Sequence, residues 1–478
     1  MSLHVSSNVL VFLSFKRISL VVTLALLILC QPTQALAGRT FFESMRRGHD
    51  AYNHGDYITA ERNYTNAIKQ IKDNVGAYYN RAIVRQQLNN LKGALEDYNT
   101  AITLDPKHVG AWMNRGNVKN QLNDISGALA DYNHAILMAP KKATAYYNRA
   151  LIKQSIKDFH GALLDYNECL ALDPTKKAAY NNRGNVKVAL GYYATAIEDY
   201  NRAVTLDPNF ADVYVNRGIA LAEHGDSVQA LSDFDHAITL DPTKALFYLY
   251  RGDTHNTLHN LLEALSDYST VLELEPQNTE AHVKRASVHI KQGHWDKALA
   301  DVNQALEQNN ENPAALSLRG RIYVELKEDT LAMVDYDKVL QLNPKDADAY
   351  YEQGILLKRA NKLEEAEHHF TAAIEFNPQL AEAYHERATL YRIQGKQEEA
   401  LEDYNKTLVL NEENAEALYH RAVINNLLGK SKQALEDVEH ATVVFKQRGD
   451  ATHLKELYEL KREVRKNIKY SIEETEDE

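Results

Sequence analysis

The chain has 478 residues, of which 25% are charged and 44% hydrophobic, and its formal net charge at pH 7 is −12. This acidic balance argues against nucleic acid as the main ligand, because nucleic-acid binding requires a basic surface. An ordinary globular chain of this length would form about three domains. The internal repeat described below predicts one linear array instead.

Residues 1–37 have the pattern of a secretory signal peptide. A basic pair at residues 16–17 precedes an apolar run over residues 18–30, and a small-residue Ala-Leu-Ala motif ends at Ala37. The apolar run is too short to span a bilayer. We therefore predict cleavage after Ala37 and export to a periplasm, an organelle lumen or the extracellular space, with no stable membrane insertion afterwards. An uncleaved membrane anchor is the alternative interpretation.

A unit of 34 residues repeats twelve times, without an insertion, from Phe41 to Arg448. A fixed period of this size is typical of a solenoid, in which each repeat buries its apolar face only against its neighbours. The predicted repeats are 41–74, 75–108, 109–142, 143–176, 177–210, 211–244, 245–278, 279–312, 313–346, 347–380, 381–414 and 415–448.

Each repeat is predicted to form two helices, over about positions 2–14 and 18–31. Position 8 is glycine or alanine and position 20 is alanine in every copy, so the two helices can approach closely, and an aromatic residue at position 24 fills the remaining space. Turn residues such as Gly191 separate the helices. A proline at position 32, such as Pro208, ends the second helix. Cys169 falls at position 27 and is predicted to be a buried small residue rather than a reactive thiol.

This pattern resembles the tetratricopeptide repeat (TPR) family: an aromatic residue at position 4, a small one at 8, alanine at 20, an aromatic at 24, a small residue at 27 and proline at 32. The resemblance covers about 85 per cent of the chain. It implies an all-α, right-handed superhelical α-solenoid of helix-turn-helix repeats, whose first helices line a concave groove that holds extended peptides. The carboxylate clamp of chaperone-binding members, a lysine at position 5 with an asparagine at position 9, is absent here.

Arginine occupies position 7 in eleven repeats and aspartate occupies position 23 in ten. The repeat without the arginine has Gln353 and His369 at these positions, so both partners change together. We therefore predict an ion pair between the two helices of each repeat. A basic binding face formed by the arginines is the alternative. The best-defined pairs are Arg81 with Asp97, Arg115 with Asp131, Arg149 with Asp165, Arg183 with Asp199 and Arg217 with Asp233.

Position 6 carries the candidate binding residues. It is asparagine in five successive repeats: Asn80, Asn114, Asn148, Asn182 and Asn216. Positions 6 and 8 differ by about 200° around a helix, so these amides should be open while position 8 is buried. They resemble the asparagine ladder in the TPR groove of O-linked N-acetylglucosamine transferases and in importin-like solenoids, which implies that they hold a peptide backbone. The alternative is that the asparagines only reflect repeat duplication.

Charge divides the array near the end of these asparagines. Repeats 1 to 5 sum to +4 and repeats 6 to 12 to −16. The first part suits an uncharged extended chain, and the second suits a partner with a basic patch. A role in solubility alone is the alternative explanation of the surface charge.

No cofactor or metal site is predicted, and the chain is interpreted as a non-catalytic scaffold or assembly factor that binds protein. His255, His259 and His289 suggest a metal, but His255 and His289 stand at the packing position 11. An enzyme would need a clustered nucleophile, base or metal set, which the repeats do not display. A self-associating structural or envelope protein is the competing interpretation.

After the last repeat, residues 449–472 are predicted to form an amphipathic helix that caps the array. Residues 473–478 include five acids and are predicted to be a disordered tail.

Overall fold

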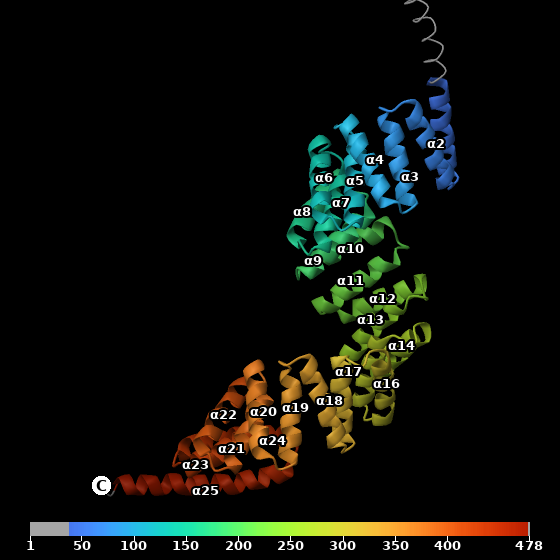
Figure 1. Cartoon of the computed structure of the whole chain (residues 1–478). Coiled ribbons are helices and arrows are strands. Elements are labelled where there is room, and N and C mark those ends of the chain that lie inside the picture. The colour runs from blue at the N-terminus through green and yellow to red at the C-terminus, as the bar shows by residue number, and fades with distance from the viewer. Residues whose placement is uncertain (1–37, 477–478) are drawn as a thin grey trace, which may run out of the picture. The chain divides into compact units, whose positions relative to one another are not determined.

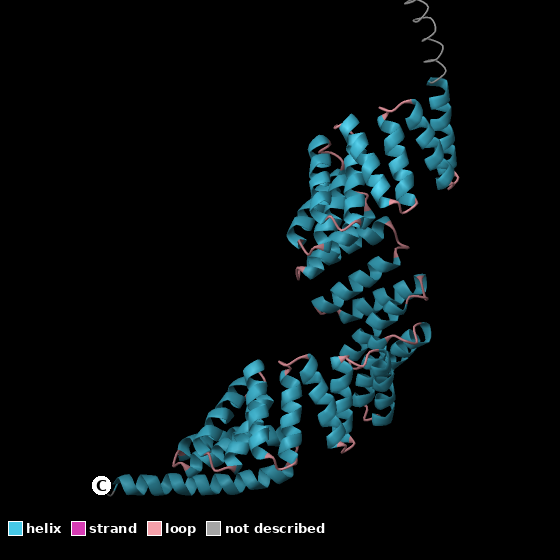
Figure 2. Cartoon of the chain, viewed as in Figure 1, coloured by secondary structure: helices cyan, strands magenta, loops and turns pink. Residues whose placement is uncertain are grey.

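The computed structural model describes residues 38–476, so the predicted signal segment lies outside the described residues. Over that part of the chain all regular structure is α-helical, with short connections between helices and no strand (Figures 1 and 2). The chain divides into two compact units, which we call unit 1, ending at Asp241, and unit 2, beginning at Pro242. This architecture is the predicted α-solenoid of helix pairs.

Unit 1 begins with a helix over residues 38–53 and continues with eleven labelled helices. They are α2 (Tyr57–Gln70), α3 (Val75–Gln87), α4 (Leu91–Leu104), α5 (Val109–Gln121), α6 (Ile125–Met138), α7 (Ala143–Ser155), α8 (Phe159–Leu172), α9 (Lys177–Ala189), α10 (Tyr193–Leu206), α11 (Ala211–His224) and α12 (Ser227–Leu240).

Unit 2 contains thirteen labelled helices in the described residues. They are α13 (Ala245–Thr257), α14 (Leu261–Leu274), α15 (Thr279–Lys291), α16 (Trp295–Gln308), α17 (Pro313–Glu325), α18 (Asp329–Leu342), α19 (Ala347–Arg359), α20 (Leu363–Phe376), α21 (Ala381–Ile393), α22 (Gln397–Leu410), α23 (Ala415–Leu427), α24 (Ser431–Arg448) and α25 (Ala451–Glu476).

The helices of a repeat begin at positions 1 and 17, one residue earlier than the sequence pattern predicts. Capping side chains stabilise this start in some of the repeats. The Asn74 side chain accepts a hydrogen bond from the backbone N–H of Ala77 before α3, and Asn90 accepts one from Gly93 before α4. Such a residue satisfies an N–H group that the first helical turn leaves unpaired.

The turn between the two helices of each repeat needs one residue in the left-handed conformation, at position 15. Glycine takes this position in half of the turns, as at Gly191 with φ 79°, and other residues adopt it elsewhere, as at Asn89 with φ 57°. Asparagine and glycine tolerate this region best. The turn is therefore fixed by backbone geometry and does not require glycine.

Small residues bring the two helices of a repeat together. The alanines at position 20 are fully buried, and a Cβ added to Gly184 would lie 2.5 Å from the ring of the buried Tyr200. The ring at position 24 therefore packs directly on the backbone at position 8. Cys169 is also buried, and its burial raises the pKa of the thiol to about 11. Such a thiol is protonated and unreactive at neutral pH.

The first helices of neighbouring repeats also contact one another, as α3 contacts α5, α9 contacts α11, and α15 contacts α17. We call the face of each unit that is formed by its first helices the inner face. Positions 2, 5, 6 and 9 of the repeat lie on this face, because they are separated by three or four residues along a helix.

The array ends in a helix that covers repeat 12. α25 packs against α24 and α23, and its Leu457 and Val464 are fully buried in a cluster with Phe445. α25 continues to Glu476, four residues beyond the predicted end of the cap, because residues 473–476 are mostly glutamate, a good helix former. Helix α25 therefore includes residues 473–476 of the predicted tail, and residues 477–478 lie outside the described residues.

None of the helices within residues 38–476 combines the length and the apolarity needed to cross a membrane.

Candidate functional site

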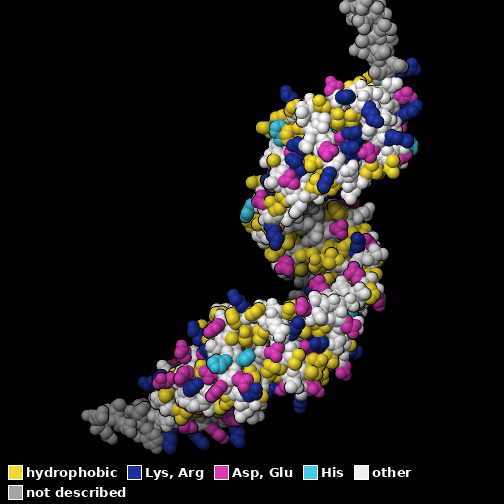
Figure 3. Space-filling view, in the orientation of Figure 1, with side chains coloured by type: hydrophobic (Ala, Val, Ile, Leu, Met, Phe, Trp, Pro, Cys, Tyr) yellow, Lys and Arg dark blue, Asp and Glu magenta, His cyan; other side chains and the backbone are white. Residues whose placement is uncertain are grey.

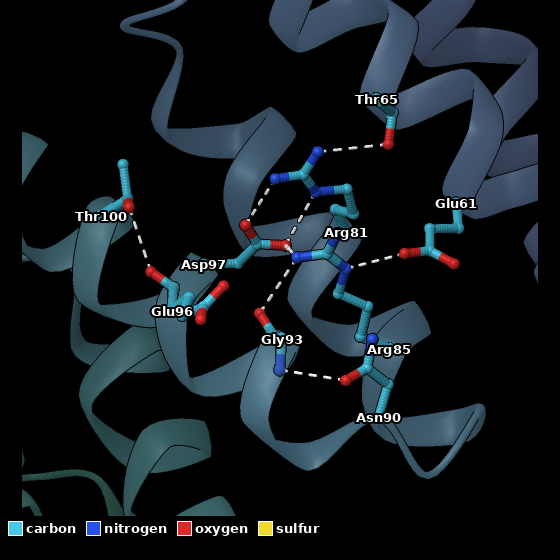
Figure 4. A network of polar contacts seen from close by, with 9 residues as sticks. All are labelled: Glu61, Thr65, Arg81, Arg85, Asn90, Gly93, Glu96, Asp97 and Thr100. Atoms are coloured by element: carbon cyan, nitrogen blue, oxygen red, sulfur yellow. Dashed lines mark hydrogen bonds and ion pairs between the residues drawn. The ribbon is translucent and has the colours of Figure 1, made fainter.

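Arginine–aspartate pairs join the two helices of a repeat beneath the inner face. In Figure 4, Arg81 Nε donates to Asp97 Oδ2 at 2.8 Å and Nη2 donates to Oδ1 at 2.6 Å. The same two-pronged geometry occurs in all ten repeats that have both residues. The other pairs are Arg115–Asp131, Arg149–Asp165, Arg183–Asp199, Arg217–Asp233, Arg251–Asp267, Arg285–Asp301, Arg319–Asp335, Arg387–Asp403 and Arg421–Asp437.

Each of these arginines also holds groups beyond its own aspartate. Arg115 Nη1 donates at 2.8 Å to Asn99 Oδ1, on the second helix of the preceding repeat, and its guanidinium lies 4.5 Å from the ring of Trp112. The arginine therefore joins two repeats and stacks on the aromatic residue at position 4. All its donors face the protein, so the arginines are structural and do not form a basic binding face.

The aspartate of unit 1 receives a second cation in four repeats. Asp199 binds Arg183 and also Lys187, whose Nζ lies 2.8 Å from Oδ2. The other three aspartates also form a second ion pair: Asp97 with Arg85, Asp131 with Lys119 and Asp165 with Lys153. Repeat 10 lacks the pair. Its Gln353 Nε2 donates at 2.7 Å to Asp337 of the preceding repeat, and its His369 Nδ1 forms a hydrogen bond with the backbone oxygen of Glu365.

The five asparagines at position 6 lie on the inner face of unit 1 and are all partly exposed. Four of them donate a hydrogen bond to the neighbouring repeat. Asn114 Nδ2 donates to the Tyr79 hydroxyl at 3.2 Å, and Asn182 Nδ2 donates to the Tyr147 hydroxyl at 3.1 Å. Asn148 Nδ2 donates to the Tyr132 hydroxyl at 3.2 Å. Each of these four amides thus uses an N–H to fix its orientation.

The last two asparagines of this set form a relay with a residue that the sequence did not single out. Asn216 Nδ2 donates to Asn181 Oδ1 at 2.9 Å, and Asn181 Nδ2 donates to Asn182 Oδ1 at 3.1 Å. The carbonyl oxygens of Asn80, Asn114 and Asn148 have no such partner among the described residues. The amides best placed to accept a hydrogen bond from a guest are therefore those of repeats 2 to 4.

Unit 2 has no asparagine at position 6 of its first helices, and its inner face contains a cavity of about 700 Å³. This volume is typical of a ligand site. The cavity is lined from the first helices α13, α15, α17, α19 and α21, and from the second helix α18. Its main side chains are Asp253, Val283, Lys284, Leu318, Arg321, Tyr336, Asp348, Tyr351, Glu352, Leu380 and Glu382.

Tyr336 lines this cavity, and its buried hydroxyl has no hydrogen-bond partner among the described residues. Its side chain is only 1% exposed. The other buried position-24 tyrosines that form a hydrogen bond pair with position 9 or 12 of their own repeat. Tyr200 donates to Asn185 and Tyr268 to Asp253, both at 2.7 Å. The repeat of Tyr336 has Arg321 and Val324 at these positions, and neither can accept a proton.

Glu352 stands beside this hydroxyl at position 6 of the next repeat. Burial raises the pKa of its carboxyl, and the positive charge of Arg321 partly opposes that shift. Glu352 forms no hydrogen bond or ion pair with any described residue. Lys284, in contrast, is already bound to Asp253, with Nζ 3.0 Å from Oδ2.

The unpaired charges around the cavity are mostly negative. Asp348, Glu352 and Glu382 form no ion pair in the described residues, against one unpaired cation, Arg321. The lining therefore has an excess of negative charge around an apolar wall of Val283, Leu318, Tyr351 and Leu380. On the wider surface in view, Figure 3 shows acidic and basic side chains interspersed with hydrophobic ones.

In the last repeats, position 6 is occupied by Glu386 and His420. The His420 ring stacks on the Tyr404 ring at a centroid distance of 5.8 Å. Burial lowers the pKa of His420 to about 4, with a further contribution from the charge of Arg392. Glu386 forms an ion pair with Lys358. Within the described residues, no group of three or more His, Cys, Asp or Glu side chains is arranged to hold a metal ion.

The sequence pattern predicted the inner position of the asparagines but missed the cavity of unit 2. A signal was present: repeat 9 is the copy with Tyr336 at position 24 and no acceptor at positions 9 and 12. Recognising it requires knowing that the hydroxyl of position 24 reaches those two positions, and the structure supplies this information.

Family models for the tetratricopeptide repeat match more than half of the chain. The chain therefore belongs to the tetratricopeptide repeat family, and the repeats make it a protein-interaction scaffold. The matched residues are 75–108, 109–142, 143–176, 184–225, 258–328, 320–360, 347–380, 369–402 and 388–429.

Solved structures with similar folds share little sequence with the chain. The Cut9-Hcn1 hetero-tetramer of the APC/C is 15% identical over 88% of this chain and 96% of that one, with a TM-score of 0.47. Yeast Tom70 is 18% identical over 88% and 99%, with a TM-score of 0.41. A tetratricopeptide repeat protein of Parabacteroides merdae is 19% identical over 52% and 99%, with a TM-score of 0.42. No curated protein sequence matches the chain.

Proposed function

We propose that the protein is an exported, non-catalytic scaffold that holds an extended polypeptide segment along the inner face of unit 1 and binds a basic partner segment on the inner face of unit 2. Export rests on the signal-peptide pattern of residues 1–37. The two binding modes rest on the different side chains that the two inner faces present.

The observation that carries the proposal is the orientation of the unit 1 amides. Asn114 and Asn148 are partly exposed, and each is fixed through one N–H to a tyrosine of the preceding repeat. The N–H and the free oxygen of a fixed amide match the C=O and N–H of a peptide group and read no side chain. Because the amides are already ordered, a guest does not have to offset the entropy of ordering them.

The test is the binding of an uncharged, fluorescein-labelled fifteen-residue peptide of serine, alanine and threonine to the mature chain, followed by anisotropy. The triple variant Asn114→Ala, Asn148→Ala and Asn182→Ala should bind about tenfold more weakly or worse, since each hydrogen bond contributes roughly 0.5–1.5 kcal/mol. A matched triple variant outside the inner face, Asn66→Ala, His160→Ala and Asn209→Ala, should bind like the wild type. Equal binding by both variants would contradict the proposal that these asparagines bind a peptide.

The export proposal is tested by expressing residues 1–478 in a secreting host and sequencing the N-terminus of the secreted protein. We expect the mature chain to begin at Gly38. Retention of the uncleaved chain in the membrane would instead support the anchor. Light scattering of the mature chain should show a monomer, and a defined oligomer would support the alternative of a self-associating structural protein.

A further inference from the structure

We propose that the cavity of unit 2 is a pocket for the side chain of one lysine or arginine of a bound peptide, with the cationic group held between Glu352 and Tyr336. This inference deepens the proposed function of unit 2, because it rests on that unit binding a basic segment. It adds the position and the residues that recognise the charge.

The unpartnered Tyr336 hydroxyl is the first argument. A buried hydroxyl without a hydrogen bond is costly, and the related tyrosines in other repeats avoid this cost with an acceptor from their own repeat. Tyr336 is among the residues that line the cavity, so a guest in the cavity lies next to the residue whose hydroxyl has no hydrogen-bond partner.

The neighbouring residue at position 6 gives the second argument. Tyr132 of unit 1 receives an N–H from Asn148 at this position, whereas Tyr336 has Glu352 there, which cannot donate when ionised. A cation between the two groups would donate N–H to the Tyr336 oxygen and to the Glu352 carboxylate. It would supply the N–H that Asn148 supplies to Tyr132 in unit 1 and neutralise a carboxylate that is partly withdrawn from water, and the ionised Glu352 carboxylate would accept the Tyr336 O–H.

Charge and shape around the pocket select a basic side chain rather than an acidic one. Asp348 and Glu382 lie near Glu352 in the lining, and Arg321 is the single unpaired cation. The lining also has an apolar wall that includes Leu318, Val283 and Tyr351. The methylene stem of lysine or arginine can pack on such a wall while the charged end reaches the carboxylate.

The experiment uses the mature chain and fluorescein-labelled, acetylated and amidated nonapeptides of serine, alanine and glycine with one central residue. The central residue is arginine, lysine, glutamine or glutamate, and binding is followed by anisotropy at 50 mM salt. Arginine and lysine peptides should bind at least about tenfold more tightly than glutamine peptides, because hydrogen bonds to charged groups are the strongest available. Glutamate peptides should bind most weakly.

Two variants test the residues of the pocket. Glu352→Gln should remove most of the preference for a basic centre, and Tyr336→Phe should reduce it about threefold while leaving the fold intact. Glu398→Gln, an exposed glutamate on α22 outside the cavity, should keep the full preference. Circular dichroism of each variant verifies that the chain is folded, and Glu382→Gln, at a second carboxylate of the lining, should weaken the preference to a smaller extent.

Two results would contradict the proposed pocket for a basic side chain. One is binding without preference for a basic central residue, and the other is a preference that is unchanged in Glu352→Gln. Either result would leave the ladder of unit 1 untouched, because the ladder is tested with an uncharged peptide and with substitutions in unit 1. Loss of binding in the unit 1 triple variant alone, with the preference for basic peptides retained, would support two independent sites.

Discussion

The inner faces of the two units carry different side chains, although the same buried layer of arginine–aspartate pairs lies beneath both. In both units an arginine at position 7 binds the aspartate at position 23, as in Arg183–Asp199 and Arg319–Asp335. One residue earlier, position 6 is asparagine throughout the ladder of unit 1, but it is tyrosine, lysine, leucine, glutamate or histidine in unit 2. The buried layer therefore fixes the backbone, and position 6 can vary without altering the fold.

The largest expected effect tests the layer that the units share. Asp199→Ala should lower the free energy of unfolding by about 3–5 kcal/mol, because it leaves Arg183 and Lys187 without their buried counter-charge. Asp335→Ala, which frees only one cation, should cost less. Urea unfolding followed by circular dichroism measures both, and the exposed Glu198→Ala is the control. Equal costs for Asp199→Ala and Glu198→Ala would show that the pairs do not stabilise the repeats.

The second prediction concerns a position-6 residue that titrates. The pKa of His420 is lowered from 6.5 to about 4 by burial, so the unfolded chain binds a proton more readily than the folded one. The stability due to this group is complete above about pH 6.5 and is lost as the pH falls towards 4, a change of about 2–3 kcal/mol. His420→Asn, which installs the unit 1 residue, should flatten this part of the stability profile of unit 2. An unchanged profile would contradict the assignment.

A smaller effect separates two tyrosines of unit 2 that occupy the same repeat position. Tyr268→Phe removes a hydrogen bond to the Asp253 carboxylate and should cost about 1.5–2 kcal/mol. Tyr336→Phe removes no hydrogen bond and should cost nothing, or stabilise the chain slightly, in the absence of a ligand. Urea unfolding of the two variants in parallel is sufficient. A loss of stability in Tyr336→Phe similar to that in Tyr268→Phe would mean that its hydroxyl is already paired.

The smallest effect concerns salt. Binding of an arginine-centred peptide to unit 2 should weaken several-fold when the salt concentration rises from 50 to 300 mM, since screening reduces the attraction between the carboxylates and the guest. Binding of an uncharged peptide to unit 1 should change little over the same range. Anisotropy titrations at both salt concentrations measure this, and a similar response of both peptides would mean that charge does not distinguish the two faces.

The sequence predicted the helix pairs because small residues and aromatics recur at a constant spacing, and helix packing depends on little else. The structure also has the arginine–aspartate pairs at the predicted positions. They could be recognised because both residues are absent together from the repeat of Gln353 and His369. The helices begin one residue earlier than the sequence predicts, both where a side chain such as Asn74 or Asn90 caps them and where none does.

The details of the inner faces could not be predicted in the same way. The bond from Asn114 to Tyr79 joins residues 35 positions apart, and its existence depends on the rotation between neighbouring repeats. The isolated hydroxyl of Tyr336 depends on which side chains it reaches across a helix pair. Such contacts follow from three-dimensional geometry and leave no periodic trace in the sequence.

Apart from Arg47 of repeat 1, a position-7 arginine such as Arg115 bonds to its own repeat and to the preceding one, so one side chain stabilises both the helix pair and the contact between neighbouring repeats. Repeat 10 separates the two roles: Gln353 keeps the bond to Asp337 of repeat 9, but it has no aspartate across its own helix pair. Its helices α19 and α20 are therefore held together by apolar packing, in which Leu357 and Phe370 are buried, without the arginine–aspartate pair.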